Sequence, residues 1–162
     1  MRLRLAAICA ALLAIELAFL PLPGINQDEV LFVAPYLKNN PGLYSWHIAG
    51  LHLPVMSMAY LGLVESWLYW PVFHFWRPGI WSIRLPECLI SVLTVLIFAD
   101  LVRRVSGARV ALAAALFLAT DAVFVMNSLF ETTASVQLLG IAIFLNLIQR
   151  SRFTAACFTA KT

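Results

Sequence analysis

Charged residues are scarce in this chain. They make up 12% of its 162 residues, whereas 62% of the residues are hydrophobic. A water-soluble domain cannot cover its surface with so few polar groups, so the composition excludes an ordinary soluble protein. The net charge is only +3 and the basic residues fall in short, scattered groups. We therefore expect no nucleic acid as a partner.

Cysteine is also sparse. The three cysteines form neither a CxxC motif nor a His/Cys pattern with the spacing of metal ligands. We expect no disulfide framework, no metal site and no cofactor. A bound divalent cation is an alternative, but no ligand motif supports it. Internal repeats are absent too, so the helices should pack as one bundle.

Long hydrophobic runs dominate what is present. About 20 residues of helix cross roughly 30 Å of hydrocarbon, and four stretches have about this length. We expect spans at about 5–22, 84–103, 109–127 and 131–148. The first of these could instead be a cleaved signal peptide, but no small-residue cleavage site follows it. The predicted fold class is all-α, a polytopic transmembrane helix bundle that forms a single membrane domain over residues 1–162.

The basic residues predict the orientation of the bundle. Eight of the eleven Lys and Arg residues fall at the N-terminus, in the turn at 103–109 or in the tail. Cytoplasmic loops carry an excess of such residues, so these three regions should be cytoplasmic. Residues 23–83 should then form a large extracytoplasmic loop. The protein is expected in a cell membrane, multi-pass, with its N-terminus in the cytoplasm.

The segment 51–76 is apolar enough to be a fifth span. An extra crossing would carry Arg103 and Arg104 outside, against the charge distribution. The segment also contains many Trp and Tyr residues, which prefer the headgroup level, and His52, Glu65 and His74 interrupt it. We therefore expect one or two interfacial helices along the outer surface.

Ionisable side chains in lipid are costly, about 2.5–3.5 kcal/mol each, so each needs a partner. Asp100 precedes Arg103 and Arg104 by three and four residues, the spacing of a helical ion pair. Glu16 lies deep in the first expected span with no partner on its own helix. It must find a donor on another helix or be protonated.

Three groups of acids are candidates for chemistry. Asp28 and Glu29 follow the first span, where prolines and a glycine stop the helix; alone, they read as a solvated turn. Glu131 opens the fourth span on the same side and could simply cap that helix. Asp121 lies roughly 18 Å along the third span from Arg109, so it needs a partner or a water-filled cavity. Together these acids predict a site at the outer face of the membrane, beneath an aromatic surface helix.

Short motifs in a fixed order resemble those of a known family. They are an acid pair after the first span, a His-Pro stretch in the loop, an Arg-Leu-Pro opening of the second span, a basic turn with a glycine, and an acid opening the fourth span. In this chain they read Gln27-Asp28-Glu29-Val30, His52-Leu53-Pro54-Val55, Ile83-Arg84-Leu85-Pro86, Arg103 to Gly107 and Asn127 to Glu131. This pattern resembles the N-terminal part of polytopic glycosyltransferases of the GT-C fold. These are the dolichyl-phosphate-mannose protein mannosyltransferases (glycosyltransferase family 39) and bacterial relatives such as the lipid A aminoarabinose transferases.

The resemblance implies roles for particular residues. Asp28 would be the base that activates the acceptor, with Glu29 as its substitute, and Glu131 would organise the acceptor or lipid-phosphate site, where the family usually has Asp. Arg84 would meet a phosphate or brace the loop, although an arginine snorkelling at a span end has the same position. His52 and Asp121 are further candidates for substrate binding. His52-Leu53-Pro54 departs from the family in its single proline.

The family implies a donor and a location. We expect transfer of a sugar from a polyprenyl phosphate to a lipid or protein acceptor, in the bacterial inner membrane. Family members are several hundred residues long, so this chain corresponds to their front part, and a C-terminal half or partner subunit would complete it. The alternative is a non-catalytic membrane protein that binds polyprenyl lipid or scaffolds a partner. Proton transport through Glu16 and Asp121 is a third reading, without a broken-helix repeat to support it.

The orientation can be tested with reporter fusions. A reporter enzyme that is active only outside the cytoplasm should be active when fused after position 28 or 131 and inactive when fused after position 106. The opposite result at position 28 or 131 would move the candidate acids to the cytoplasm and remove the predicted site.

Overall fold

The structure is a computed structural model. It describes residues 1–22, 24–25, 29–30, 33–34, 44–48, 51–58, 61–62, 64–130 and 132–159. Within these ranges only the backbone is described at 51–54, 56–58, 61–62, 64–66, 132–134 and 152–159. Asp28 and Glu131 lie outside the described residues.

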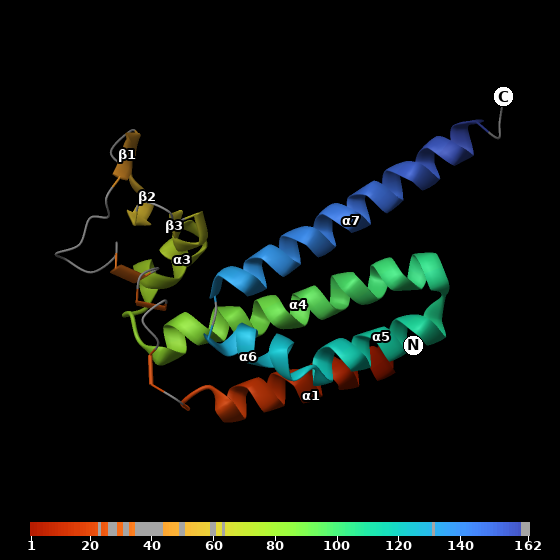
Figure 1. Cartoon of the computed structure of the whole chain (residues 1–162), viewed down its shortest axis with the longest axis horizontal. Helices are drawn as coiled ribbons and strands as arrows, with labels where there is room; N and C mark the ends of the chain where they lie inside the picture. The colour runs from red at the N-terminus through yellow and green to blue at the C-terminus, as the bar shows by residue number, and fades with distance from the viewer. Residues whose placement is uncertain are drawn as a thin grey trace.

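Most of the described chain is helical, as predicted. Five helices form an elongated bundle: α1 (Arg2–Phe19), α4 (Ile80–Ser106), α5 (Ala108–Thr120), α6 (Ala122–Phe130) and α7 (Thr132–Thr159). Helix α4 lies centrally and packs against the other four. Figure 1 shows α3 (Val64–Phe75) and a small sheet at one end, while α1 begins and α7 ends toward the other.

The turn between α4 and α5 rests on one glycine. Gly107 alone separates α4 from α5, and its N–H donates to the carbonyl of Arg103. Its φ of +86° belongs to the left-handed region, which a side chain disfavours. The turn therefore lets α5 fold straight back along α4 (Figure 1).

The expected third span is broken at Asp121. Helices α5 and α6 meet there at an angle of 57°. Asp121 has an extended backbone, and its Oδ1 accepts the N–H of Phe124 at 2.7 Å. This is an N-cap bond, which opens a new helix instead of continuing the old one. The region of the expected span 109–127 is therefore two helices instead of one continuous helix, and the span itself stays a prediction.

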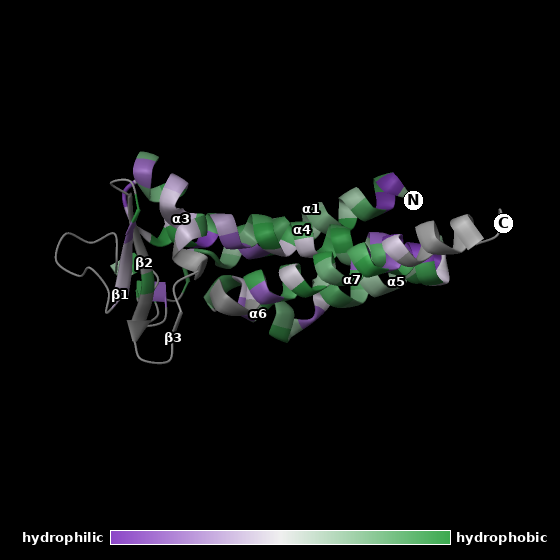
Figure 2. Cartoon of the chain, turned by 90° about the horizontal axis from the view of Figure 1, so that it is seen from above, coloured by the Kyte–Doolittle hydropathy of each residue, from purple (hydrophilic) through white to green (hydrophobic). Residues whose placement is uncertain are grey.

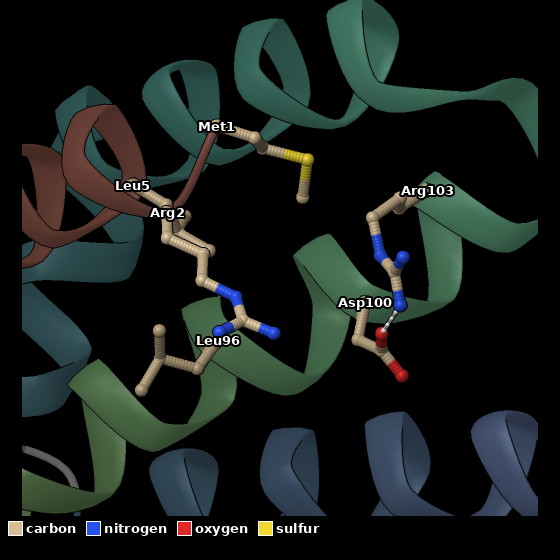
Figure 3. A pocket seen from close by; sticks show the side chains of 6 residues that line it. All are labelled: Met1, Arg2, Leu5, Leu96, Asp100 and Arg103. Atoms are coloured by element: carbon tan, nitrogen blue, oxygen red, sulfur yellow. Dashed lines mark hydrogen bonds and ion pairs between the residues drawn. The ribbon is translucent and has the colours of Figure 1, made fainter.

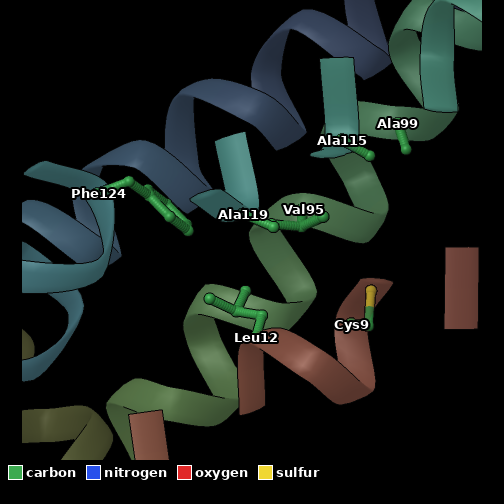
Figure 4. Close-up of a cluster of buried hydrophobic side chains, with 7 residues drawn as sticks. All are labelled: Cys9, Leu12, Val95, Ala99, Ala115, Ala119 and Phe124. Carbon is green, nitrogen blue, oxygen red and sulfur yellow. The ribbon is translucent and has the colours of Figure 1, made fainter. Parts of the chain in front are cut away.

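Small side chains let the helices approach closely. Ala111, Ala115 and Ala119 recur every four residues on α5, and all are buried. Four-residue spacing places them on one face, where small residues allow close backbone contact. Figure 4 shows Ala115 and Ala119 in a cluster with residues of α1, α4 and α6. The members of this core are Cys9, Leu12, Val95, Ala99, Ala115, Ala119 and Phe124.

Large apolar side chains cover the outside of the bundle. Phe117 is 74% exposed and Phe144 is 61% exposed, and Figure 2 shows hydrophobic residues along the lengths of the helices. Within the described ranges, α4 is the one helix that is long and apolar enough to cross a membrane. The bent pair α5 and α6 would add a second if it forms one span. The arrangement of four spans stays a prediction.

The loop before α4 is only partly the helix we expected. Helix α3 accounts for the second half of segment 51–76, but residues 51–58 and 61–62 form strands. The sheet has the order β1 (Tyr44–Ile48), β2 (Leu51–Met58), β3 (Leu61–Gly62), and both pairs are antiparallel. Interfacial helices over the whole segment were therefore wrong.

Two local signals explain the strands. Polar and apolar residues alternate along Tyr44-Ser45-Trp46-His47-Ile48, which is the period of a strand. Ile48 pairs with Leu51 across Ala49-Gly50, the separation of a two-residue hairpin connection. Pro54, which has no N–H to donate, pairs with Ser45 next to the register shift of β1, where a proline is tolerated.

Glu16 joins three helices in the middle of the bundle. Its side chain on α1 is fully buried. The hydroxyl of Ser91 on α4 lies 2.6 and 2.8 Å from its two oxygens, and that of Ser128 on α6 lies 2.6 Å from Oε1. Of the two alternatives predicted for Glu16, a donor on another helix is present, and it is supplied by two serines.

Replacing Glu16 should loosen α1. Glu16→Ala leaves two buried hydroxyls without this acceptor and should destabilise the protein by about 1–3 kcal/mol. Glu16→Gln keeps a carbonyl acceptor and should cost clearly less. Thermal unfolding in detergent micelles measures both; equal stability of Glu16→Ala and the parent would refute the role of this junction.

Candidate functional site

Arg84 is the centre of the candidate site. It lies one turn into α4 and is completely buried. A guanidinium has five N–H groups, and among the described residues Arg84 makes five hydrogen bonds. Two of them reach the carboxylate of Glu29, from Nε at 2.6 Å and from Nη2 at 2.9 Å. This two-point geometry is the strongest that an arginine makes with a carboxylate.

The other three hydrogen bonds hold the C-cap of α1 and the residues that follow it. Nη1 donates to the carbonyls of Leu20 and Leu22 at 2.7 and 2.9 Å, and Nη2 donates to the carbonyl of Gly24 at 3.0 Å. The last carbonyls of a helix have no partners within the helix, and they carry its partial negative charge. Arg84 therefore ties the end of α1 to the start of α4. We call Arg84, Glu29 and these three carbonyls the Arg84 clamp.

Apolar side chains close the clamp off from its surroundings. The ring of Phe130, the last residue of α6, lies 5.0 Å from the guanidinium carbon, within the range of a cation–π contact. Phe130 also packs on a buried cluster of Leu20, Cys88 and Leu129. Low polarity around the ion pair strengthens it, because little water competes for its hydrogen bonds.

A second buried polar contact docks α3 onto α4. The hydroxyl of Tyr69 hydrogen-bonds with Oε1 of Glu87 and lies 2.9 Å from the carbonyl oxygen of Ile83. Both Tyr69 and Glu87 are buried, and Tyr69 stacks on Phe73 at 5.4 Å between ring centroids. Glu87 follows Arg84 by three residues, so the two side chains lie on neighbouring turns of one face of α4.

Sequence reasoning missed Tyr69 and Glu87. Glu87 had a usable signal, since an acid three residues after Arg84, inside an apolar helix, needs a partner. Tyr69 had none of its own, because it is one of many aromatic residues in segment 51–76.

The predicted site residues are only partly brought together. Glu29 and Arg84 meet directly. Asp121 caps α6 and makes no described contact with the Arg84 clamp. His52 lies on β2, where its backbone pairs with His47, and its side chain is outside the described part. The predictions for Asp28 and Glu131 fall on residues that the structure does not describe.

The contacts distinguish two roles that were open for Arg84. Its N–H groups are engaged by protein acceptors, which favours bracing of the loop over contact with a phosphate. Glu29 is likewise engaged in the ion pair, with 1% of its side chain exposed. No group of three His, Cys, Asp or Glu residues in the described part of the chain could hold a metal ion.

The ion pair expected at Asp100 is confirmed at the other end of α4. Asp100 Oδ1 lies 2.6 Å from Nη2 of Arg103, and Oδ2 lies 2.8 Å from Nε of Arg104. Asn146 on α7 is 3.4 Å from the same Oδ2. Helix α4 therefore carries a buried clamp at its start and a partly exposed ion-pair cluster near its end.

The apolar exterior, the long apolar α4 and the paired buried charges are typical of a helical membrane protein. Residues 61–153 match the model of the family described as dolichyl-phosphate-mannose-protein mannosyltransferase. The match covers more than half of the chain, so the chain belongs to this family, whose members are membrane glycosyltransferases of the GT-C kind. The predicted resemblance is confirmed. No curated protein and no solved structure matches the chain.

The matched region includes α4 to α6, most of α7, and Arg84. Asp28 and Glu29 precede it. The family match therefore rests on the region from α3 to α7 and not on α1 or the acid pair.

Breaking the Arg84 clamp should destabilise the fold strongly. Arg84→Gln or Glu29→Gln leaves the other charge buried with fewer partners, which should cost about 3–5 kcal/mol for each. Arg84→Lys should also destabilise, because an ammonium cannot reproduce the fork that binds Glu29 and three carbonyls. Chemical unfolding in micelles measures these losses.

A double-mutant cycle separates the ion pair from the rest of the clamp. The double variant R84Q/E29Q should lose less than the sum of the two single losses, because no lone charge stays behind. Additive losses would mean that Arg84 and Glu29 do not act as a pair.

Proposed function

We propose that this chain is a glycosyltransferase, or the N-terminal portion of one. It transfers a sugar from a polyprenyl-phosphate donor to a lipid or protein acceptor at the extracytoplasmic face of the membrane. The family match supports the function of a membrane glycosyltransferase. The donor, the acceptor and the face are parts of the proposal.

The Arg84 clamp is the observation that supports a site at this end of the bundle. Glu29 and Phe130 both contact Arg84. In the sequence, Glu29 is next to Asp28 and Phe130 is next to Glu131, and neighbouring Cα atoms are about 3.8 Å apart. One buried guanidinium thus touches the neighbours of both candidate acids, which supports the proposal that Asp28 and Glu131 serve one pocket.

In the proposed reaction Asp28 is the general base. It takes the proton of the acceptor hydroxyl or amine as that group attacks the anomeric carbon of the sugar. The bond from the anomeric carbon to the lipid phosphate oxygen breaks, and the polyprenyl phosphate leaves with the bonding electrons. Glu131 orients the acceptor or the lipid phosphate. Arg84 acts as a positioning residue, because its hydrogen bonds go to Glu29 and to the end of α1.

The proposed topology has four spans in a bacterial inner membrane. The N-terminus and the turn at Gly107 face the cytoplasm, and the Arg84 clamp faces outward. Helix α3 then lies over the outer ends of the spans, held there by Tyr69 and Glu87. His52 and Asp121 remain proposed substrate contacts in this arrangement.

One observation favours a second, non-catalytic function. The acids Glu16, Glu29, Asp100 and Asp121 all make structural contacts to serines, arginines or backbone. A protein that only binds a polyprenyl lipid, or scaffolds a partner subunit, would use its acids in this way.

The mechanism predicts a selective loss in the Asp28→Asn variant. Removal of a general base should lower sugar transfer by about 10²–10⁴-fold, without loss of membrane insertion or stability. The assay expresses the chain in membranes supplied with radiolabelled polyprenyl-phosphate sugar, and it scores binding and transfer separately.

Asp100→Asn is the matched control. It makes the same chemical change at the opposite end of α4, and it should leave transfer within a few-fold of the parent. Unchanged transfer in Asp28→Asn would remove this mechanism. Lipid binding without transfer by the parent chain would select the non-catalytic function.

A further inference from the structure

A cavity lies at the end of the bundle opposite the Arg84 clamp. It has a volume of about 400 Å³ and lies between the start of α1 and the last turns of α4. Figure 3 shows the six residues that line it: Met1, Arg2, Leu5, Leu96, Asp100 and Arg103. The cavity therefore combines apolar walls with two guanidinium groups.

The guanidinium groups have unused donors. The side chain of Arg2 makes no hydrogen bond or ion pair with the described part of the chain, and it extends toward α4 in Figure 3. Arg103 makes one hydrogen bond from its side chain there, from Nη2 to Asp100. Most of the N–H groups of both arginines are thus available to an anion.

Asp100 offsets only part of this positive charge. Its carboxylate already contacts Arg103 at 2.6 Å and Arg104 at 2.8 Å, and Arg150 on α7 lies 3.8 Å away. One carboxylate therefore faces three guanidinium groups, and Arg2 adds a fourth from α1. The surplus charge favours an anion with several acceptor oxygens, such as a phosphate.

The apolar walls distinguish a lipid from a free ion. Leu5 and Leu96 line the same cavity, and Leu96 is also part of the exposed apolar surface of α4. The cavity lies at helix ends, the level of lipid headgroups in a membrane-spanning bundle. A lipid could place its phosphate against the arginines of the cavity and its hydrocarbon against the leucines.

We propose that this cavity binds the headgroup phosphate of an anionic phospholipid. Arg2 and Arg103 hold the phosphate oxygens, and Leu5 and Leu96 contact the first part of the acyl chains. Asp100 positions Arg103 and leaves its remaining donors free for the lipid. The site is separate from the proposed sugar-transfer site, which lies at the start of α4.

Native mass spectrometry of the full chain tests the proposal. The protein is released from micelles that contain phosphatidylglycerol or phosphatidylcholine with the same acyl chains, and the retained lipid is titrated. We expect tighter retention of phosphatidylglycerol, and a loss of roughly tenfold or more in its affinity in R2Q/R103Q. Leu96→Trp, which fills the cavity without a change in charge, should also weaken retention.

R4Q/R109Q is the matched control. It removes the same charge from the same end of the bundle, but neither residue lines the cavity. It should keep most of the affinity of the parent. Equal losses in the two double variants, or equal retention of the two lipids, would overturn the proposal. Release of the lipid by millimolar inorganic phosphate would assign the site to a free phosphate and overturn the lipid assignment. Unfolding temperatures of all variants show whether they fold.

Discussion

The pairing of Arg84 with Glu29 constrains the rest of this structure. A charged side chain in an apolar bundle is costly unless its partners are complete, and this guanidinium satisfies its donors with a carboxylate and three backbone carbonyls. The partners come from the end of α1 and from the segment that follows it. The clamp therefore fixes where α1 ends, and it sets the direction in which the chain leaves the bundle.

Polar contacts at three levels hold α4 in the bundle. The Arg84 clamp is at its start, the Glu16 junction with Ser91 and Ser128 is in the middle, and the Asp100 cluster is near its end. Apolar packing with small residues fills the levels between them. In lipid the hydrophobic effect does little to bring helices together, so close packing and interhelical hydrogen bonds must do so. The three levels also set the register of α1 and α6 against α4, because a shift by one residue would leave buried carboxylates without their hydrogen-bond partners.

The two ends of α4 suit different tasks. At its start the guanidinium is closed off and saturated, so it positions neighbouring chain segments. Near its end the guanidinium groups are partly exposed and only partly used, so they can meet an anion. The difference follows from the surroundings: Phe130 and its apolar cluster cover Arg84, whereas Arg103 is 46% exposed beside a cavity.

The sequence by itself determined the membrane class, the mostly helical fold and the family. Helices built from long apolar runs with few charges are soluble in lipid and not in water. Local spacing was enough to pair Asp100 with Arg103 and Arg104. It also required a partner for Glu16. Only the tertiary structure decided that the partners are serines of two other helices, that Arg84 binds Glu29 and the end of α1, and that Tyr69 meets Glu87. It also revealed the break at Asp121 and the strands β1, β2 and β3. The contacts of Glu16, Arg84 and Tyr69 join residues far apart in the chain, so no local pattern could specify them. The break and the strands do have local signals, but these signals compete with the helical tendency of the same apolar segments, and packing resolves that competition.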